Sequence, residues 1–327
     1  MKHGFEKLAA ALLAVLMTAG CGAQTVQTAQ PAGIAAQAVP MAAKTSGAAK
    51  AVPVAASAVP LSITPEASGK LAQKTNNAVI DYSNTADGYI MARYTGSTTA
   101  KLKAQVTGPS GVVYTYDLTA GKWAVFSLSD GNGSYKASIF QNVSGSKYAT
   151  VTSVSFTAEM KNDFAPFLLP NQYVDYSAAP NSVAKAKELT KGKKDTLEQV
   201  QAIYEFVVDH LTYDKEKAAN VKSGYLPVLD TVLAQKKGIC FDYAALMAGM
   251  LRSQGVPCKL VVGYAGKAYH AWINVYSEEN GWVNGAIYFD GDSWKLMDPT
   301  FASSGKQSKE IMSYIGDGSH YTAKYIY

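Results

Sequence analysis

Arginine is scarce in this chain, and its scarcity argues against a nucleic-acid-binding function. Only Arg93 and Arg252 occur among the 30 basic residues of a 327-residue chain whose formal net charge is +5. The lysines are scattered along the sequence and do not gather on one periodic face. Direct recognition of nucleic acid favours arginine side chains and a concentrated basic surface. We therefore expect a solvated, lysine-rich surface and no nucleic-acid partner.

Cysteine is also scarce, which excludes a disulfide-dense scaffold. The chain contains Cys21, Cys240 and Cys258. The residues between Cys240 and Cys258 predict a helix of about fourteen residues, which would be roughly 20 Å long. Bridged cysteines need Cα atoms within about 7 Å of each other. We expect no disulfide here and interpret Cys258 as a small buried apolar residue.

Signatures of bound metals and cofactors are missing as well. His210 and His320 are isolated from each other and from Cys240, so a zinc site is not indicated. The segment Asp290–Asp292 lacks the acidic spacing of a calcium loop and predicts a hairpin turn instead. No P-loop and no dinucleotide-binding glycine pattern occurs. We expect a protein that works without a cofactor or a metal.

The start of the chain has the layout of a secretory signal. Residues 1–20 combine a short, mostly basic start with an apolar run from Leu8 to Met17, which is too short to span a bilayer permanently. The small residues before Cys21 resemble the bacterial lipobox, in which cleavage leaves this cysteine as a lipidated N-terminus. Thr18 departs from the leucine usual in that motif. Simple secretion and an uncut membrane anchor are the alternatives.

Residues 21–72 are expected to be a flexible tether. They are rich in alanine, valine, proline, glutamine, threonine and serine, and they contain no aromatic residue. Such a segment cannot bury enough apolar surface to offset the entropy lost on ordering. Together with the lipidation of Cys21, the tether places the folded part outside the cell. We expect it at the outer face of a bacterial cell membrane, attached by lipid only, with partial secretion as the alternative.

Residues 73–162 are expected to form a β-sandwich of immunoglobulin-like type. Clusters of glycine, asparagine, aspartate and serine separate seven segments with the composition of strands. These segments are 78–82, 89–94, 100–106, 112–116, 123–128, 133–140 and 149–156. No cluster of titratable residues lies among them, so we expect this domain to serve in spacing or weak binding.

Residues 163–327 are expected to form a second domain with a different pattern. Helical periodicity covers 182–190, 196–211 and 226–235 and returns in a helix that begins at Cys240. Four predicted strands follow, at 259–264, 269–276, 285–290 and 293–298. Helices followed by an antiparallel sheet indicate an α+β fold. In the helix after Cys240, the spacing of Ala244, Met247, Ala248 and Leu251 predicts one inward-facing apolar stripe.

Cys240 is the strongest candidate for a chemically active residue. It lies where a turn gives way to an apolar helix, and the unpaired N–H groups of a helix start favour a thiolate. Lys236 and Lys237 would add positive charge, and the same N–H groups could hold an oxyanion. The alternative is a buried thiol that only fills space between helix and sheet.

His270 and Asp298 could complete a triad with Cys240. Strand alternation places Ala271 on the core face and His270 on a polar-aromatic face together with Trp272. Asp298 ends a strand because Pro299 cannot continue one, so its carboxylate could hold a neighbouring imidazole. Taken singly, His270 could be a structural histidine and Asp298 the start of a turn.

The order of these residues resembles the transglutaminase-like superfamily. The resemblance covers roughly residues 195–300 and consists of separate motifs in the family order. These motifs are Gly238–Ala244, Leu251–Pro257, Gly263–Tyr264, His270–Trp272, and Trp294 with Met297–Thr300. The resemblance implies a papain-like core, in which helices pack on an antiparallel sheet. It also implies Cys240 as nucleophile, His270 as general base and acid, and Asp298 as the orienting carboxylate.

The implied chemistry is acyl transfer or hydrolysis at an amide bond. The thiolate would attack an amide carbonyl, the imidazole would protonate the leaving amine, and a thioester would form. Water would then give hydrolysis by a protease or amidase, and an amine would give the cross-link of a transglutaminase. The partner would be a protein or peptide substrate, with cell-wall-associated proteins as one source. The alternative function is a non-catalytic surface module for binding or adhesion on the same fold.

Overall fold

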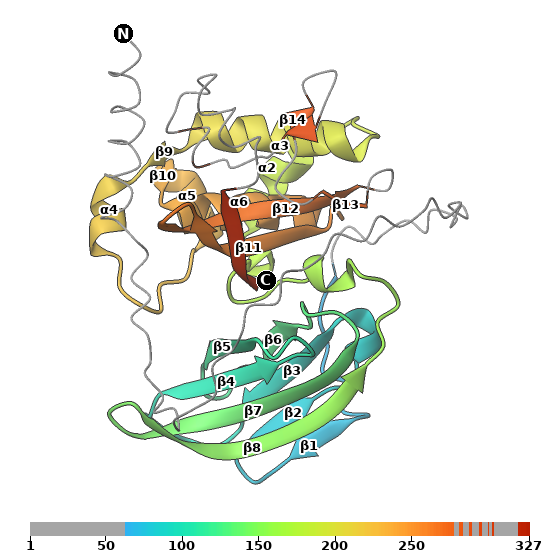
Figure 1. Cartoon of the computed structure of the whole chain (residues 1–327), viewed down its shortest axis with the longest axis vertical. Coiled ribbons are helices and arrows are strands. Elements are labelled where there is room, and N and C mark those ends of the chain that lie inside the picture. Colours follow the sequence, from blue (N-terminus) through green and yellow to red (C-terminus); the bar gives the residue numbers. More distant parts are fainter. Residues whose placement is uncertain are drawn as a thin grey trace.

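The computed structural model describes residues 63–277, 281–283, 288–289, 294–295, 300, 303 and 320–327. Two sheets form the lower part of the molecule in Figure 1, and helices with a further large sheet form the upper part. Cys21, the signal and most of the tether lie outside the described residues. Within the described chain, no helix is long and apolar enough to cross a membrane.

The lower part is a sandwich of two four-stranded antiparallel sheets, which follow the strand orders β1-β2-β3-β6 and β5-β4-β7-β8. All seven strands that the sequence predicted here are confirmed, and β1 is an addition. The bounds are β1 Ala72–Lys74, β2 Ala78–Asp81, β3 Tyr89–Tyr94, β4 Leu102–Thr107, β5 Val113–Leu118, β6 Ala124–Ser127, β7 Gly133–Ser144 and β8 Lys147–Ala158, with a 3-10 turn at Thr85–Asp87.

The sandwich forms because its strands alternate between core and surface. Along β4, Leu102, Ala104 and Val106 are buried while the residues between them are partly exposed. Successive side chains of a strand point to opposite faces, so this pattern buries one face of each sheet. Across the core, the rings of Tyr116 and Phe126 lie 4.7 Å apart and join the two sheets.

The upper part begins with helices that the sequence largely anticipated. Asp195 caps one of them by accepting a hydrogen bond from the N–H of Leu197 at 2.6 Å. Asp214 caps a short helix that periodicity did not predict, because it is little more than one turn long. The bounds are α2 Pro180–Thr190, α3 Thr196–His210, α4 Lys215–Asn220, α5 Leu229–Gln235 and α6 Cys240–Ser253, preceded by 3-10 turns η2 Ala165–Phe167 and η3 Tyr176–Ala178.

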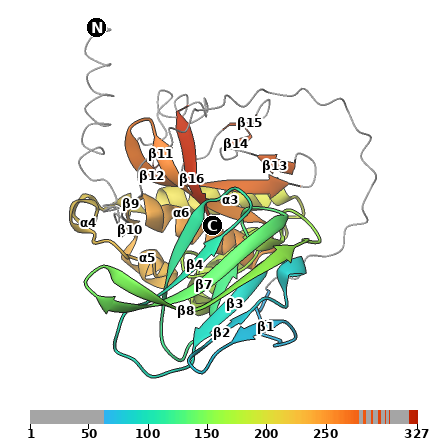
Figure 2. The same ribbon diagram turned by 60° about the horizontal axis from the view of Figure 1, so that its bottom comes forward.

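An antiparallel sheet in the order β13-β12-β11-β16 completes the upper part and confirms the α+β class. Figure 2 shows β11, β12 and β16 side by side. The sequence did not predict β16, which pairs with β11. The bounds are β11 Cys258–Ala265, β12 Ala268–Ser277, β13 Gly281–Val283 and β16 Tyr321–Ile326.

Two small strand pairs accompany this sheet. β9 (Thr212–Tyr213) pairs in parallel with β10 (Lys237–Gly238). β14 (Tyr288–Phe289) pairs antiparallel with β15 (Trp294–Lys295), which confirms the hairpin expected around 290–292. The remaining residues of the two predicted strands around this hairpin lie outside the described chain.

The predicted apolar stripe of helix α6 is fully buried, and nearly all of the remaining helix surface is buried as well, with only Phe241 partly exposed. Tyr243, Ala245, Leu246 and Met250 lie outside that stripe, yet they too have no exposed surface. The helix contacts β11 and β12 of the sheet and also α2, α3 and α5. A helix enclosed by a sheet and other helices buries its whole circumference.

Aromatic rings join the sandwich to the upper part. Tyr327 follows β16. Its ring centre lies 5.6 Å from that of Tyr114 and 6.2 Å from that of Tyr116, and both of these tyrosines are on β5. Its ring is 4.1 Å from that of Tyr173, whose hydroxyl donates a hydrogen bond to the Thr115 carbonyl oxygen at 3.0 Å. These contacts make the sandwich a packed neighbour of the helices and their sheet.

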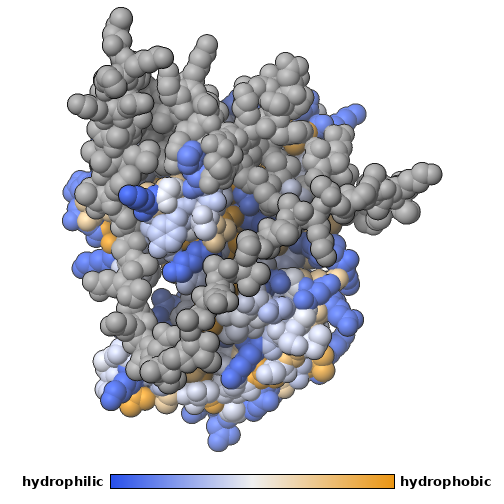
Figure 3. All heavy atoms as spheres, in the orientation of Figure 1, coloured by the Kyte–Doolittle hydropathy of each residue, from blue (hydrophilic) through white to orange (hydrophobic). Residues whose placement is uncertain are grey.

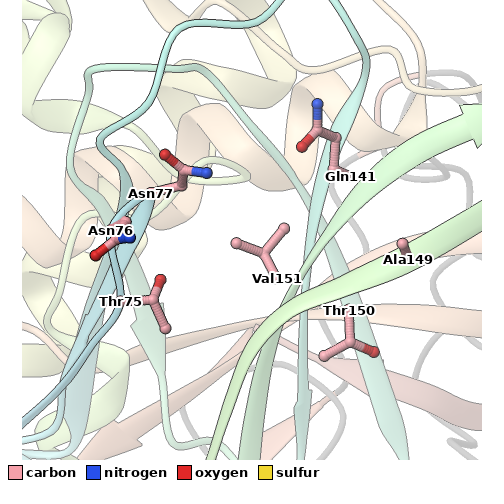
Figure 4. Close-up of a pocket in the computed structure, with 7 residues that line it drawn as sticks. All are labelled: Thr75, Asn76, Asn77, Gln141, Ala149, Thr150 and Val151. Atoms are coloured by element: carbon pink, nitrogen blue, oxygen red, sulfur yellow. The ribbon is translucent and has the colours of Figure 1, made fainter.

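The described surface offers no broad apolar patch on the face shown in Figure 3, where hydrophobic residues form small spots among hydrophilic ones. The sandwich carries an open hollow of about 480 Å³ (Figure 4). Its lining residues are Thr75, Asn76, Asn77, Gln141, Ala149, Thr150 and Val151. All of them belong to the sandwich, so this hollow is separate from Cys240 and His270.

Substitution Tyr116→Ala tests the packing of the two parts. Tyr116 is 2% exposed and contacts rings in both parts, so its truncation should lower the free energy of unfolding by about 3–5 kcal/mol. Denaturant titration followed by circular dichroism measures this change. The control Val143→Ala removes a side chain that is 68% exposed and should change stability by less than about 0.5 kcal/mol. Equal effects of the two substitutions would contradict the packing described here.

Candidate active site

Backbone pairing leads the chain directly into Cys240. β10 pairs with β9, and the N–H of Asp214 donates to the Gly238 carbonyl oxygen at 2.9 Å. Ile239 keeps an extended conformation and precedes the helix, so Cys240 is the first residue of α6. Its side chain is a thiol that forms no disulfide, in a residue only 5% exposed. The thiol therefore occupies the helix end where the backbone favours negative charge.

Asp242 fixes this first turn from within. It is fully buried, and its Oδ2 accepts a hydrogen bond from the N–H of Ile239 at 2.8 Å. Two side chains also reach its carboxylate: the Lys217 ammonium at 2.6 Å and the Tyr225 hydroxyl at 2.5 Å. A Cβ at Gly238 would lie 2.5 Å from that of Asp242, so only glycine leaves room for this arrangement.

The two lysines expected to support the thiolate are engaged elsewhere or exposed. The Lys237 ammonium lies 3.2 Å from the Asp214 carboxylate, whose pKa is lowered by the Lys217 backbone N–H and also by Lys237. Lys236 caps the end of α5 in a left-handed conformation with φ of 55° and is exposed. The positive charge bound to the first turn of α6 comes instead from Lys217.

His270 lies on β12, the strand that packs against α6. It is 4% exposed, and its ring lies 6.5 Å from the rings of both Trp272 and Tyr321. The predicted aromatic surroundings of this histidine are therefore present. The elements that carry Cys240 and His270 are direct neighbours in the fold.

Strand β11 lies between β16 and β12, the strand that carries His270. Gly263 pairs with His270 on one side and with Ala323 on the other, and the pairing with β16 shifts register at this point. A Cβ at Gly263 would overlap the carbonyl oxygen of Thr322, so glycine is required for this close approach. Tyr321 of β16 thus reaches across β11, and its ring lies 6.5 Å from the His270 ring.

Asp298 lies outside the described residues, but the chain on its C-terminal side returns to α6. Thr300 is fully buried. The Ser303 hydroxyl donates to the Leu211 carbonyl oxygen at 2.8 Å and lies 3.2 Å from the hydroxyl of Tyr243. Tyr243 is three residues after Cys240 and therefore adjacent on the helix surface.

Cys258 is a free thiol at the opposite end of the helix and has no exposed surface. Burial raises the pKa of this thiol to about 12, and the nearby Arg252 guanidinium offsets the rise only in part. Arg252 itself donates hydrogen bonds to the backbone oxygens of Cys258, Leu169 and Tyr327 at 2.6–2.8 Å. Cys258 therefore belongs to a structural junction.

Metal ligation finds no support among the described residues, where histidine, cysteine and carboxylate side chains form no group of three suited to a metal ion. A ring nitrogen of His210 lies 2.9 Å from the carbonyl oxygen of Leu233. This histidine therefore packs against the backbone of α5.

Sequence reasoning missed Lys217 and Tyr225, and it gave Asp242 no role. One signal was available, because an aspartate inside an apolar helix must find a cation or several donors. The identity of those donors depends on α4 and on the loop after it. Neither has a sequence pattern that points to Asp242.

Residues 183–285, just under a third of the chain, match the model of the transglutaminase-like superfamily. The mouse kyphoscoliosis peptidase is 32% identical over 118 residues, which are 36% of this chain and 17% of that protein. A protein-glutamine gamma-glutamyltransferase of Pseudomonas aeruginosa is 28% identical over 120 residues, and the uncharacterized protein YebA of Bacillus subtilis is 26% identical over 132 residues. These matches cover 32% and 33% of this chain and 18% of each relative. The chain thus spans less than a fifth of each of these relatives.

Solved structures are more distant. A candidate cysteine protease from Cytophaga hutchinsonii has 15% identity and a TM-score of 0.35, covering 70% of this chain and 68% of that one. The red sea bream transglutaminase has 14% identity and a TM-score of 0.25, covering 65% and 48%. Both TM-scores are low and mark only a remote likeness.

Because Cys258 is buried, we predict that its thiol reacts slowly with alkylating reagents in the folded protein. A rise in pKa from 9.0 to about 12 lowers the thiolate fraction near pH 8 about a thousandfold. In a Cys240→Ala protein, iodoacetamide should therefore leave Cys258 unmodified until denaturant is added, after which it should react as an ordinary thiol. Peptide mass spectrometry measures this labelling. Equal labelling of Cys258 in the folded and the unfolded protein would show that the burial is wrong.

Proposed function

Residues 183–285 belong to the transglutaminase-like superfamily, and on that premise we propose that this chain is a cysteine enzyme that acts on amide bonds of proteins or peptides. The observation that carries the proposal is the position of Cys240. It opens a buried helix that packs against the strand bearing His270. A cysteine at a helix start beside a histidine is the arrangement that activates a thiol as nucleophile.

The proposed reaction begins with attack on an amide carbonyl. The Cys240 sulfur forms a bond to the carbonyl carbon, and the positive end of the helix stabilises the oxyanion. The carbon–nitrogen bond then breaks, and protonated His270 gives its proton to the departing amine. The products of this half-reaction are a thioester on Cys240 and a free amine or ammonia. Asp298 orients the imidazole and stabilises its positive charge.

The second half-reaction depends on the acceptor. Water attacks the thioester in a hydrolase, and a primary amine such as a lysine side chain attacks it in a transglutaminase. In both cases neutral His270 takes a proton from the acceptor, and the thiolate departs. The burial of Cys240 and His270 limits the access of water, and this condition lets an amine compete as acceptor. The proposed lipid anchor at Cys21 makes surface proteins the first substrates to test.

Incubation with a labelled primary amine tests the proposed function. Candidate surface proteins are mixed with the wild-type chain, and mass spectrometry detects amine incorporation, deamidation or peptide cleavage. Cys240→Ala and His270→Gln should each lower product formation by at least about a thousandfold, because each removes a reacting group. Incorporation identifies transfer, and deamidated or cleaved products identify hydrolysis.

Cys258→Ala is the matched control. It removes the other described thiol, lies outside the proposed site, and should leave product formation nearly unchanged in the protein that remains folded. A Cys240→Ala protein that forms product at the wild-type rate would exclude the proposed mechanism. The non-catalytic surface module would then be the better account.

A further inference from the structure

The first turn of α6 holds a negative charge that opposes the proposed chemistry. Asp242 is the third residue of the helix, and Cys240 is the first. A carboxylate disfavours a second negative charge close to it. At the effective dielectric constant of about 20 that describes protein sites, this repulsion matters over several ångströms. The buried aspartate therefore needs compensation if the sulfur is to carry charge.

We infer that Lys217 is a positioning residue for Cys240. Its ammonium neutralises the Asp242 carboxylate, so that Asp242 can hold the start of the helix without opposing negative charge on the cysteine sulfur. This inference rests on the proposed function, because it assigns Lys217 a purpose in a thiolate enzyme. It adds a residue that lies outside the triad.

The geometry fits an ion pair that is built into the site. The Lys217 ammonium lies 2.6 Å from Oδ2 of Asp242 and 2.5 Å from the hydroxyl of Tyr225, which in turn donates to Oδ1 at 2.5 Å. Asp242 is fully buried, and the side chain of Lys217 is 25% exposed. A buried carboxylate is tolerated only when it is paired and hydrogen-bonded, and both conditions are met here.

The lysine is held in place by its own helix and by the adjacent loop. Asp214 caps α4 through the Lys217 N–H at 2.9 Å, which fixes the residue at the start of that helix. The Tyr225 ring lies 4.2 Å from the ammonium and 6.4 Å from the ring of Phe241, the residue after Cys240. The Lys217 ammonium is thus held by helix α4, which carries the residue, and by the Tyr225 ring, which also contacts Phe241.

Several other charged or titratable groups belong to the elements around this turn, and all must be kept unchanged in a test. Among the described residues they include Tyr243 of α6, Tyr213 of β9, Asp214, Lys236, Lys237 of β10, Tyr173, Tyr225 and His270 of β12. Lys237 is already paired with Asp214 at 3.2 Å. Lys217 is the cation that contacts Asp242.

The test follows alkylation of Cys240 by iodoacetamide as a function of pH, measured on its peptide by mass spectrometry in the full chain. Lys217→Met should move the midpoint of reaction upward by about one pH unit, since Asp242 keeps its other donors and its negative charge. Asp242→Asn should move it downward, because the lysine is then uncompensated. The double variant should return it to within a few tenths of the wild-type midpoint. Lys217→Arg should leave it nearly unchanged.

Lys161→Met is the matched control. Lys161 and Asp87 are also 2.6 Å apart, but their pair is exposed on the sandwich, so the midpoint should not move. Thermal unfolding checks that each variant is folded, and opposite shifts in the single variants cannot arise from general loosening. If the Lys217→Met protein does not fold, the other two variants still decide. A downward shift of the midpoint in Asp242→Asn, absent from the double variant, supports the inference. An Asp242→Asn midpoint equal to that of the wild type overturns it.

The outcome separates this inference from the proposed function. A wild-type midpoint near the ordinary thiol value of about 8.5 would remove the basis of the proposed function. A low wild-type midpoint with folded Lys217→Met unshifted would refute the role of Lys217 alone. Shifts of equal sign in Lys217→Met and Asp242→Asn would also refute it.

Discussion

The site depends on one constraint, the burial of helix α6, in which every residue but Phe241 is buried. The helix is enclosed by β11 and β12 and by three other helices, so its position is fixed from every side. Its first residue is Cys240, and the backbone around that residue is held by the β9–β10 pair and by Asp242. A nucleophile at the end of such a helix is positioned by the core itself. Exchange of a residue in the first turn of α6 therefore acts on the site as well as on stability.

The sandwich takes part in this packing, although its own hollow is separate from the site. Tyr114 and Tyr116 pack on Tyr327, which follows β16, the strand whose Tyr321 ring lies 6.5 Å from the His270 ring. Tyr173 lies between these rings and Phe241, whose ring is 6.0 Å away. Aromatic contacts therefore run from β5 of the sandwich to the residue after Cys240. This continuity gives the sandwich a structural role at the site in addition to the spacing expected from its sequence.

Sequence patterns revealed most elements because their signals are local. The alternation of buried and exposed residues along β4 and the apolar spacing along α3 can be recognised within a few neighbouring residues. The transglutaminase-like motifs likewise follow one another along the chain. The partners of Asp242 could not be found this way, because Lys217 and Tyr225 reach it from α4 and a loop. β16 was missed because it is an edge strand in which three consecutive residues, Thr322 to Lys324, are exposed, so it lacks the alternation of a half-buried strand. The apolar spacing along α6 predicted one buried stripe correctly but not the burial of the other faces, because tertiary packing, not periodicity, decides how many faces of a helix are covered.

The convergence of Cys240, His270 and Asp298 is the central claim, and a crystal structure of the protein at neutral pH measures it directly. We expect the Cys240 sulfur within about 3–4 Å of one ring nitrogen of His270, with the Asp298 carboxylate within hydrogen-bonding distance of the other nitrogen. A sulfur-to-ring separation beyond about 7 Å, or an Asp298 carboxylate turned away from the ring, would contradict this account.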